Sequence, residues 1–163
     1  MANPFCEILS QILSQEVKKL LTKDKKLHIG GTYLAMEGPA FSTRAESNLY
    51  RDWGCSIIGM TNHTEARLAK EAEIAYSSLS MVTDYDCWNQ NCESVSVEMV
   101  IKNLQENANF AKSIISAAAK TISKIRPSSP FHNALKDALV TPEEHVPEKT
   151  KSKIKLFTDK YWR

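Results

Sequence analysis

Residues 55–82 read "CSIIGMTNHTEARLAKEAEIAYSSLSMV", and this stretch decides the fold. The apolar run at its start predicts a short buried strand. The polar middle predicts a helix with Asn62 or Thr64 as its N-cap, and residues 74–82 have the character of a second strand. Strands that alternate with helices of about ten residues indicate a parallel sheet with helices on both faces, which is an α/β fold.

The preceding sequence continues this alternation. Apolar residues at helical spacing predict an amphipathic helix over about residues 6–23, and residues 26–36 have the composition of a strand. A further helix is expected just before residue 55. Thr43 and Glu46 have the spacing of a capping box at its start, and Gly54 lies where the residue after its C-cap is expected.

The remainder of the chain is predicted to be mainly helical. Apolar positions hold the helical period over about residues 97–125, with Ser96 as a plausible cap, and "RPSSP" at 126–130 ends this helix. A short helix is expected near "HNALKDAL", residues 132–139. The tail at 140–163 is Lys-rich, ends in aromatic residues, and is amphipathic at best.

Length and composition are those of one globular domain over residues 1–163. The hydrophobic fraction is 42% and the charged fraction is 25%, as in ordinary globular proteins. The formal net charge of +2 gives no reason to expect a nucleic acid or an anionic membrane as a partner. No apolar run of about 18 residues and no secretion signal are present, so we expect a cytoplasmic protein.

The cysteines and histidines are dispersed rather than clustered. Without a CxxC pair or a secretion signal, reduced thiols are expected, with Cys55 packed in the core. The histidines are equally scattered, so no metal site is predicted. The cysteines are Cys6, Cys55, Cys87 and Cys92, and the histidines are His28, His63, His132 and His145.

The glycines predict where a site lies. All five fall between Gly30 and Gly59, which places unusual backbone in loops at strand ends. Ligands of open parallel sheets bind beyond the carboxyl ends of the strands. Three segments are therefore expected to converge there: "EGPAFST" at 37–43, "GMTNHTEA" at 59–66 and "TDYDCW" at 83–88.

The last of these segments sets two carboxylates two positions apart. In an extended chain Asp84 and Asp86 point to the same side of the strand end. The residues alone leave other roles open. Asp84 could simply bond nearby amides while Asp86 stays solvated, Phe41 and Met60 could be core residues, and Thr61 and Thr64 could be helix caps.

The sequence resembles a known family at these segments. "GTYLAMEGPAFSTRAES" at 31–47, "IIGMTNHTEARLAKEAEIAYSSLSMVTDYDCW" at 57–88 and "VSVEMVIKNLQENANFAKSII" at 95–115 resemble S-methyl-5′-thioadenosine phosphorylases, of the trimeric purine nucleoside phosphorylase superfamily. The similarity extends from Met1 to about Leu139 and is loose in the tail. It implies a three-layer α/β/α sandwich that lacks the N-terminal part of the family's sheet.

The resemblance also implies a reaction. These enzymes split S-methyl-5′-thioadenosine with inorganic phosphate, without a cofactor, into adenine and 5-methylthioribose 1-phosphate. They are homo-oligomers, trimers or hexamers. By resemblance Asp84 donates a proton to purine N7, and Asp86 accepts a hydrogen bond from the 6-amino group. A carboxylate suits this amine and disfavours a 6-oxo group.

The other site residues come from the same resemblance. Phe41 and Ser42 match positions that line the purine pocket, with Phe41 against the ring face. Met60 matches a residue under the ribose and the alkylthio group. Thr61 matches a phosphate-contacting hydroxyl at the start of a helix, where anions are favoured.

One departure from the family leaves the function open. The N-terminal half of the family holds most of the phosphate site, and its glycine-rich turn and its arginine–histidine pair have no counterpart here. The chain is therefore expected to be a piece of the phosphorylase. The alternatives are a non-catalytic adenine-binding module and a phosphorylase of another purine nucleoside.

Overall fold

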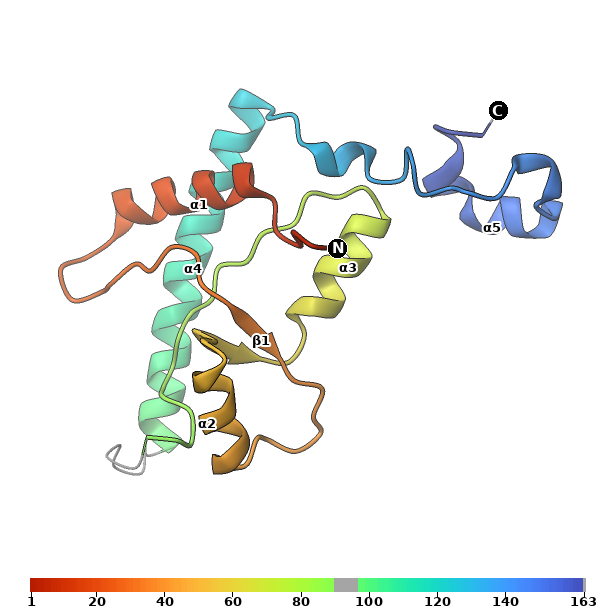
Figure 1. Cartoon of the computed structure of the whole chain (residues 1–163). Helices are drawn as coiled ribbons and strands as arrows, with labels where there is room; N and C mark the ends of the chain where they lie inside the picture. Colours follow the sequence, from red (N-terminus) through yellow and green to blue (C-terminus); the bar gives the residue numbers. More distant parts are fainter. Residues whose placement is uncertain (90–96, 163) are drawn as a thin grey trace.

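The structure, a computed structural model, describes residues 1–89 and 97–162. The described part consists of helices and a two-stranded parallel sheet (Figure 1). The α/β class is thus confirmed, and the strand at 57–59 pairs in parallel with the strand at 33–35. The expected cap at Ser96 and the thiol of Cys92 lie outside the described residues.

The sheet pairs β1 (Tyr33–Ala35) with β2 (Ile57–Gly59). Ala35 lies opposite Gly59 in this register, and the Met36 amide donates to the Gly59 carbonyl at 2.9 Å. Both strands are shorter than predicted, and β2, which was predicted to be buried, is half-buried like β1. Strand burial depends on neighbouring strands and covering helices, and the described residues cover this sheet only in part.

Helix α2 (Arg44–Asp52) begins and ends where the sequence predicts. The Glu46 amide donates to the Thr43 hydroxyl at 3.3 Å, and the Thr43 amide donates to the Glu46 carboxylate at 2.7 Å, so the capping box is confirmed. Gly54 has a φ of +77° after the C-cap, a left-handed conformation that residues with a Cβ rarely adopt.

Helix α3 (Asn62–Glu71) follows β2 directly, and the prediction of its cap was wrong. Thr61 is the N-cap residue, and its side chain makes no capping hydrogen bond. Asn62 is instead the first helical residue, with a buried side chain whose oxygen accepts from the Tyr76 hydroxyl at 2.6 Å. A contact from the following segment therefore takes the oxygen that was expected to cap the helix.

Residues 74–82 do not form the predicted strand. The backbone is irregular there, and the sheet of the described chain contains only β1 and β2. A strand requires a neighbour with which it exchanges backbone hydrogen bonds. No described residue pairs with this segment, so the prediction of a strand there was wrong for the described chain.

The helical core is formed by α1 (Glu7–Leu20) and α4 (Val97–Ile125), which cross each other as Figure 1 shows. Both helices confirm the predicted periodicity. The buried Glu16 carboxylate of α1 accepts from Lys19 at 2.7 Å and from the Thr121 hydroxyl of α4 at 2.9 Å. The buried apolar residues are Cys6, Ile12, Val17, Ala66, Ile114 and Ala118.

The cysteines differ from the prediction in one respect. Cys55 is only half-buried, whereas Cys6 is enclosed, with its sulfur 3.4 Å from the Ser129 hydroxyl. Cys6, Cys55 and Cys87 are free thiols. The thiol packed in the core is thus the one at the start of α1, which the sequence analysis did not single out.

The C-terminal segment extends away from this core in Figure 1. A 3₁₀ helix, η1 (Pro130–Asn133), and a set of turns replace the helix predicted near 132–139. A second 3₁₀ helix, η2 (Glu143–His145), precedes α5 (Glu148–Thr158). Proline lacks an amide hydrogen and restricts its neighbours, which favours the short turns that begin at Pro130.

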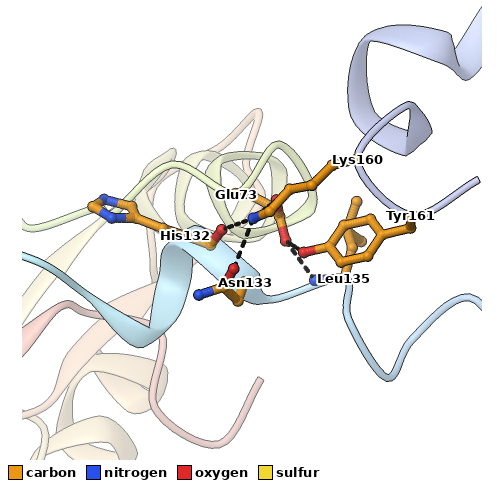
Figure 2. A network of polar contacts seen from close by, with 6 residues as sticks. All are labelled: Glu73, His132, Asn133, Leu135, Lys160 and Tyr161. Carbon is orange, nitrogen blue, oxygen red and sulfur yellow. Dashed lines mark hydrogen bonds and ion pairs between the residues drawn. The ribbon is translucent and has the colours of Figure 1, made fainter.

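One carboxylate joins this segment to the end of α3 (Figure 2). Glu73, whose side chain is 14% exposed, accepts from the Leu135 amide at 2.9 Å, from Lys160 at 3.1 Å and from the Tyr161 hydroxyl. Lys160 also donates to the His132 carbonyl at 2.6 Å and to the Asn133 side chain at 2.7 Å. Because these groups come from three segments, the network fixes the tail against the body.

The charge of Glu73 makes this junction dependent on pH. Burial acts to raise the pKa of the Glu73 carboxyl, but the hydrogen bonds from Tyr161, the Leu135 amide and Lys160 outweigh it and hold the pKa below 4.5. Above pH 4.5 the carboxylate is ionised in both states, so its stabilisation is fully present. As pH falls below 4.5, the unfolded state takes up the proton first. The stabilisation is then lost progressively until the pH has fallen below the lowered pKa of the folded state.

We therefore expect acid to release the tail. Amide exchange over residues 148–158, corrected for the intrinsic effect of pH, should rise as pH falls below 4.5. In Glu73→Gln this exchange should already be fast at pH 7 and should lose its pH dependence. Glu71→Gln is the control, because its exposed carboxylate pairs only with Arg67. An unchanged pH dependence in Glu73→Gln contradicts the assignment.

Candidate functional site

The three predicted segments meet beside the carboxyl ends of β1 and β2. Cys87 lies at the centre of the contacts: its sulfur is 3.4 Å from the Ser42 carbonyl, and its own carbonyl accepts from Arg44 Nε at 3.3 Å. The turn at 86–89 is closed by a hydrogen bond from the Asn89 amide to the Asp86 carbonyl. The convergence of residues 37–43 with 83–88 is therefore observed directly.

The loops that follow the two strands also touch each other. Gly38 has a φ of +76°, and a Cβ built there would lie 2.4 Å from the terminal methyl of Met60. Only glycine leaves space for that methyl, so the Met60 side chain lies against the backbone of the Gly38 turn. The Ser42 hydroxyl contacts the Met36 sulfur at 3.4 Å. Met60 and Ser42 thus belong to one cluster of loops.

Helix α2 supplies the support for the acidic segment. Arg44, Ser47 and Arg51 recur at helical spacing and so share one side of α2. Arg44 contacts the Cys87 carbonyl, Ser47 donates to Asp86, and Arg51 stacks on the Trp88 ring at 3.8 Å from its centroid. Ser47 and Arg51 were not predicted from the sequence. The signal that could have found them is this polar stripe on a helix already predicted.

The two aspartates have different surroundings. Asp86 is half-buried, and one carboxylate oxygen accepts from the buried Ser47 hydroxyl at 2.5 Å while the other accepts from the Cys87 amide at 2.8 Å. Asp84 is exposed and accepts from the neighbouring Thr83 hydroxyl at 2.6 Å. Asp86 is therefore held in a fixed position, and Asp84 is held only by an adjacent residue.

Aromatic side chains surround this acidic segment. Tyr85 and Trp88 make an edge-to-face contact with their centroids 5.7 Å apart. Phe41 is 85% exposed, which is unusual for a phenylalanine. This exposed ring, next to Ser42 in the loop that contacts the turn at Cys87, offers a face for a flat ligand, but the described residues do not enclose it.

The start of α3 holds a second polar cluster. The Glu65 carboxylate accepts from the Thr61 and Tyr76 hydroxyls, and these bonds lower the pKa of Glu65. Burial, together with the Glu65 carboxylate, raises the pKa of Tyr76 to about 12. The buried side-chain nitrogen of Asn62 has no partner among the described residues. The Glu65 carboxylate would repel an anion bound at Thr61 unless positively charged groups from elsewhere offset its charge.

Within residues 1–89 and 97–162, no three His, Cys, Asp or Glu side chains form a group that could hold a metal ion. None of the described helices is long and apolar enough to cross a membrane.

Comparison with known proteins assigns the fold. The family model of the phosphorylase superfamily matches residues 1–120. The chain belongs to the phosphorylase superfamily. The matched residues include β1, β2, the three converging segments and most of α4, so the superfamily assignment covers the whole candidate site.

Curated relatives agree with this assignment. The chain is 61% identical to the S-methyl-5′-thioadenosine phosphorylase of Prochlorococcus marinus over 99% of its own length and 52% of the relative's. It is 51% identical to the corresponding protein of Thermosynechococcus vestitus, over 98% of the chain and 55% of that relative. The chain thus spans about half the length of these curated relatives.

Solved structures extend the comparison to the fold. A methylthioadenosine phosphorylase from an Antarctic soil metagenomic library matches with a TM-score of 0.91 at 44% identity, over 96% of this chain and 55% of that one. A methylthioadenosine phosphorylase from Schistosoma mansoni in complex with adenine matches with a TM-score of 0.63 at 35% identity, over 76% of this chain and 48% of that one. The predicted phosphorylase fold is confirmed for the portion of the fold that this chain represents.

Replacement of Ser47 tests the support of Asp86. We expect Ser47→Ala to destabilise the chain by about 1–3 kcal/mol, because one oxygen of Asp86 loses its buried donor. Urea unfolding followed by helical circular dichroism measures this change. Ser113→Ala is the control, since its exposed hydroxyl bonds only to the preceding turn of α4. Equal effects of the two substitutions contradict the assigned contact.

Proposed function

We propose that this chain forms the purine-recognising part of an S-methyl-5′-thioadenosine phosphorylase. The observation that carries the proposal is the 61% identity, over 99% of the chain, to a relative of that name. The geometry supports it, because a fixed carboxylate and an exposed aromatic ring lie at one edge of a parallel sheet, where ligands of such sheets bind.

The proposed reaction is phosphorolysis. A phosphate oxygen forms a bond to the anomeric carbon of the ribose as the bond from that carbon to purine N9 breaks, and the bonding electrons go to adenine. Asp84, as a protonated carboxyl, donates its proton to purine N7 and neutralises the developing charge. No cofactor is required, because inorganic phosphate is the second substrate.

In this mechanism Asp86 selects the purine. Its two oxygens already accept from Ser47 and from the Cys87 amide, which fixes the carboxylate plane. Each oxygen keeps a second lone pair, so the group still accepts a hydrogen bond from a 6-amino group. A 6-oxo group would place two acceptors against each other, which disfavours oxopurines.

The remaining contacts follow from the same arrangement. Phe41 lies against the purine face and Ser42 lines the pocket, while Met60 contacts the ribose and its alkylthio group. Thr61 binds phosphate, with further donors from outside this chain that offset the nearby Glu65 carboxylate.

The exposure of Asp84 indicates what the chain lacks for this reaction. A carboxyl that acts as an acid near neutral pH needs a closed, partly apolar environment. Asp84 is exposed among the described residues, so residues from another segment must cover it. We also propose that the protein is a cytoplasmic homo-oligomer, a trimer or a hexamer, and that residues 1–163 form a single domain, which carries the purine part of the site.

A chimera tests the proposed activity. Residues 1–163 replace the matching portion of the Prochlorococcus marinus relative, and adenine release from S-methyl-5′-thioadenosine and phosphate is measured. We expect phosphate-dependent turnover. A folded chimera that binds adenine without turnover supports the alternative, a non-catalytic adenine-binding module, and turnover of inosine alone rejects the proposed substrate.

Substitution of Asp84 tests the acid in this chimera. We expect Asp84→Asn to lower kcat by about 10²–10⁴, because the amide cannot donate the proton that the leaving purine needs. Asp52→Asn, at an exposed aspartate at the end of α2, is the control. Equal turnover in the two variants removes Asp84 from the mechanism.

Substitution of Asp86 tests purine selection separately. We expect Asp86→Asn to reduce the preference for 6-aminopurine over 6-oxopurine nucleosides by about tenfold or more, because an amide can also donate to a 6-oxo group. The ratio of kcat/KM for the two nucleosides measures this preference. A fall in both rates with an unchanged ratio rejects the selection role.

A further inference from the structure

The hydroxyl hydrogen of Thr61 is already used within the chain. The Glu65 amide donates to the Thr61 carbonyl at 3.1 Å, and the Glu65 carboxylate accepts from the Thr61 hydroxyl. An ionised carboxylate has no hydrogen to give, so the hydrogen in the second contact belongs to Thr61. A threonine hydroxyl has one hydrogen and two lone pairs, so the positions left free on the Thr61 oxygen are acceptors.

Tyr76 fixes the position of the Glu65 carboxylate. Its hydroxyl lies 2.9 Å from the Glu65 carboxylate and 2.6 Å from the side-chain oxygen of Asn62, and it donates to both. The Tyr76 ring stacks on Phe5 with the centroids 6.0 Å apart, and the Tyr76 carbonyl accepts from the Cys6 amide at 2.6 Å. Tyr76 is therefore held by the start of the chain, and it holds Glu65 against the first turn of α3.

An anion at Thr61 must therefore bring its own hydrogen to that oxygen. Hydrogen phosphate carries a hydroxyl that donates, whereas sulfate carries only acceptor oxygens, which would face the lone pairs of Thr61. We propose that Glu65 is a positioning residue that holds Thr61 as a hydrogen-bond acceptor, so that the site takes oxyanions that carry a hydroxyl, such as phosphate and arsenate, and disfavours sulfate. This inference rests on the proposed binding of phosphate at Thr61.

This role accounts for a carboxylate beside an anion site. The charge of Glu65 weakens the binding of every anion, but the acceptor that it creates at Thr61 costs most for an anion without a hydrogen to donate. The carboxylate thus sacrifices affinity for selection among anions. The contact also distinguishes the phosphate oxygens, because the one that donates to Thr61 is a hydroxyl and an unprotonated oxygen is left to attack the anomeric carbon.

Threonine variants of the full 163-residue chain test the contact without any reaction. The carboxyl carbon of Glu65 is followed by NMR as the pH is lowered. We expect Thr61→Val to raise the pKa of Glu65 towards 4.5, because the carboxylate loses a donor, and Thr61→Ser to keep this pKa low. Thr64→Val, in the same turn of α3, is the control and should leave the pKa unchanged. An unchanged pKa in Thr61→Val overturns the proposal.

Anion binding to the chimera tests the consequence of this contact. The dissociation constants of phosphate and sulfate are measured by titration calorimetry at mildly alkaline pH, where both are dianions and differ mainly in the phosphate hydroxyl. We expect Glu65→Ala to lower the preference for phosphate over sulfate about tenfold or more, because the Thr61 hydrogen becomes free to donate to either anion. Glu71→Ala is the control, since it removes an equal charge from an exposed carboxylate at the other end of α3.

The outcomes separate this inference from the proposed function. An equal preference in the parent chimera and in Glu65→Ala, or a chimera that does not bind phosphate, overturns the inference. A chimera that shows the shift in preference but releases no adenine contradicts the proposed function and leaves the role of Glu65 intact. Circular dichroism of each variant checks that the helices persist, and the threonine variants decide the contact independently of Glu65→Ala.

Discussion

The parallel pairing of β1 with β2 determines where every element of the candidate site lies. Because the strands run in the same direction, the chain leaves both of them at one edge, and the turns at Gly38 and Met60 come into contact. The connection between the two strands, which contains α2, must then return along the sheet. This connection places Arg44 and Ser47 of α2 in contact with the turn at 86–89. A shift of one residue in this register would move each strand's side chains to the opposite face.

The support around the acidic segment is uneven, and its distribution has a physical cause. Asp86 is fixed by donors from α2 and from its own turn, all of which lie within the described chain. Asp84 projects from the same segment into solvent, with only Thr83 beside it. Groups that recognise a ligand can be positioned by local turns and one helix. A group that must act as an acid needs enclosure on several sides, and enclosure requires more polypeptide.

The sequence predicted local structure well and non-local structure poorly, for reasons that particular residues illustrate. The ends of α2 followed from Thr43, Glu46 and Gly54, since caps act within one turn of the helix. The strand at 74–82 did not form, because its hydrogen bonds depend on a neighbour that composition cannot supply. Asn62 was assigned as a cap, but a hydroxyl fourteen residues later takes its oxygen.

The candidate site shows the same contrast between local features, which the sequence predicts, and non-local contacts, which it does not. The glycines and the expected strand ends predicted the convergence of three loops, because strand ends in a parallel sheet share an edge. Ser47 and Arg51 were not predicted, because their contacts are distant in sequence. Ser47 donates to Asp86, which lies 39 residues away, and Arg51 stacks on the ring of Trp88. Their spacing on α2 was nevertheless visible. A polar stripe on a helix that is otherwise expected to pack against a sheet indicates contact with something polar beyond the sheet edge.

Asp84 and Asp86 follow directly from the unpaired segment at 77–82, and they differ in what holds them. The position of Asp86 is set within the described residues, because its donors are already in place. Asp84 has only the neighbouring Thr83 hydroxyl as a donor. In the proposed mechanism, the group that recognises the purine is therefore positioned by the described residues, whereas the proposed proton donor still requires enclosure.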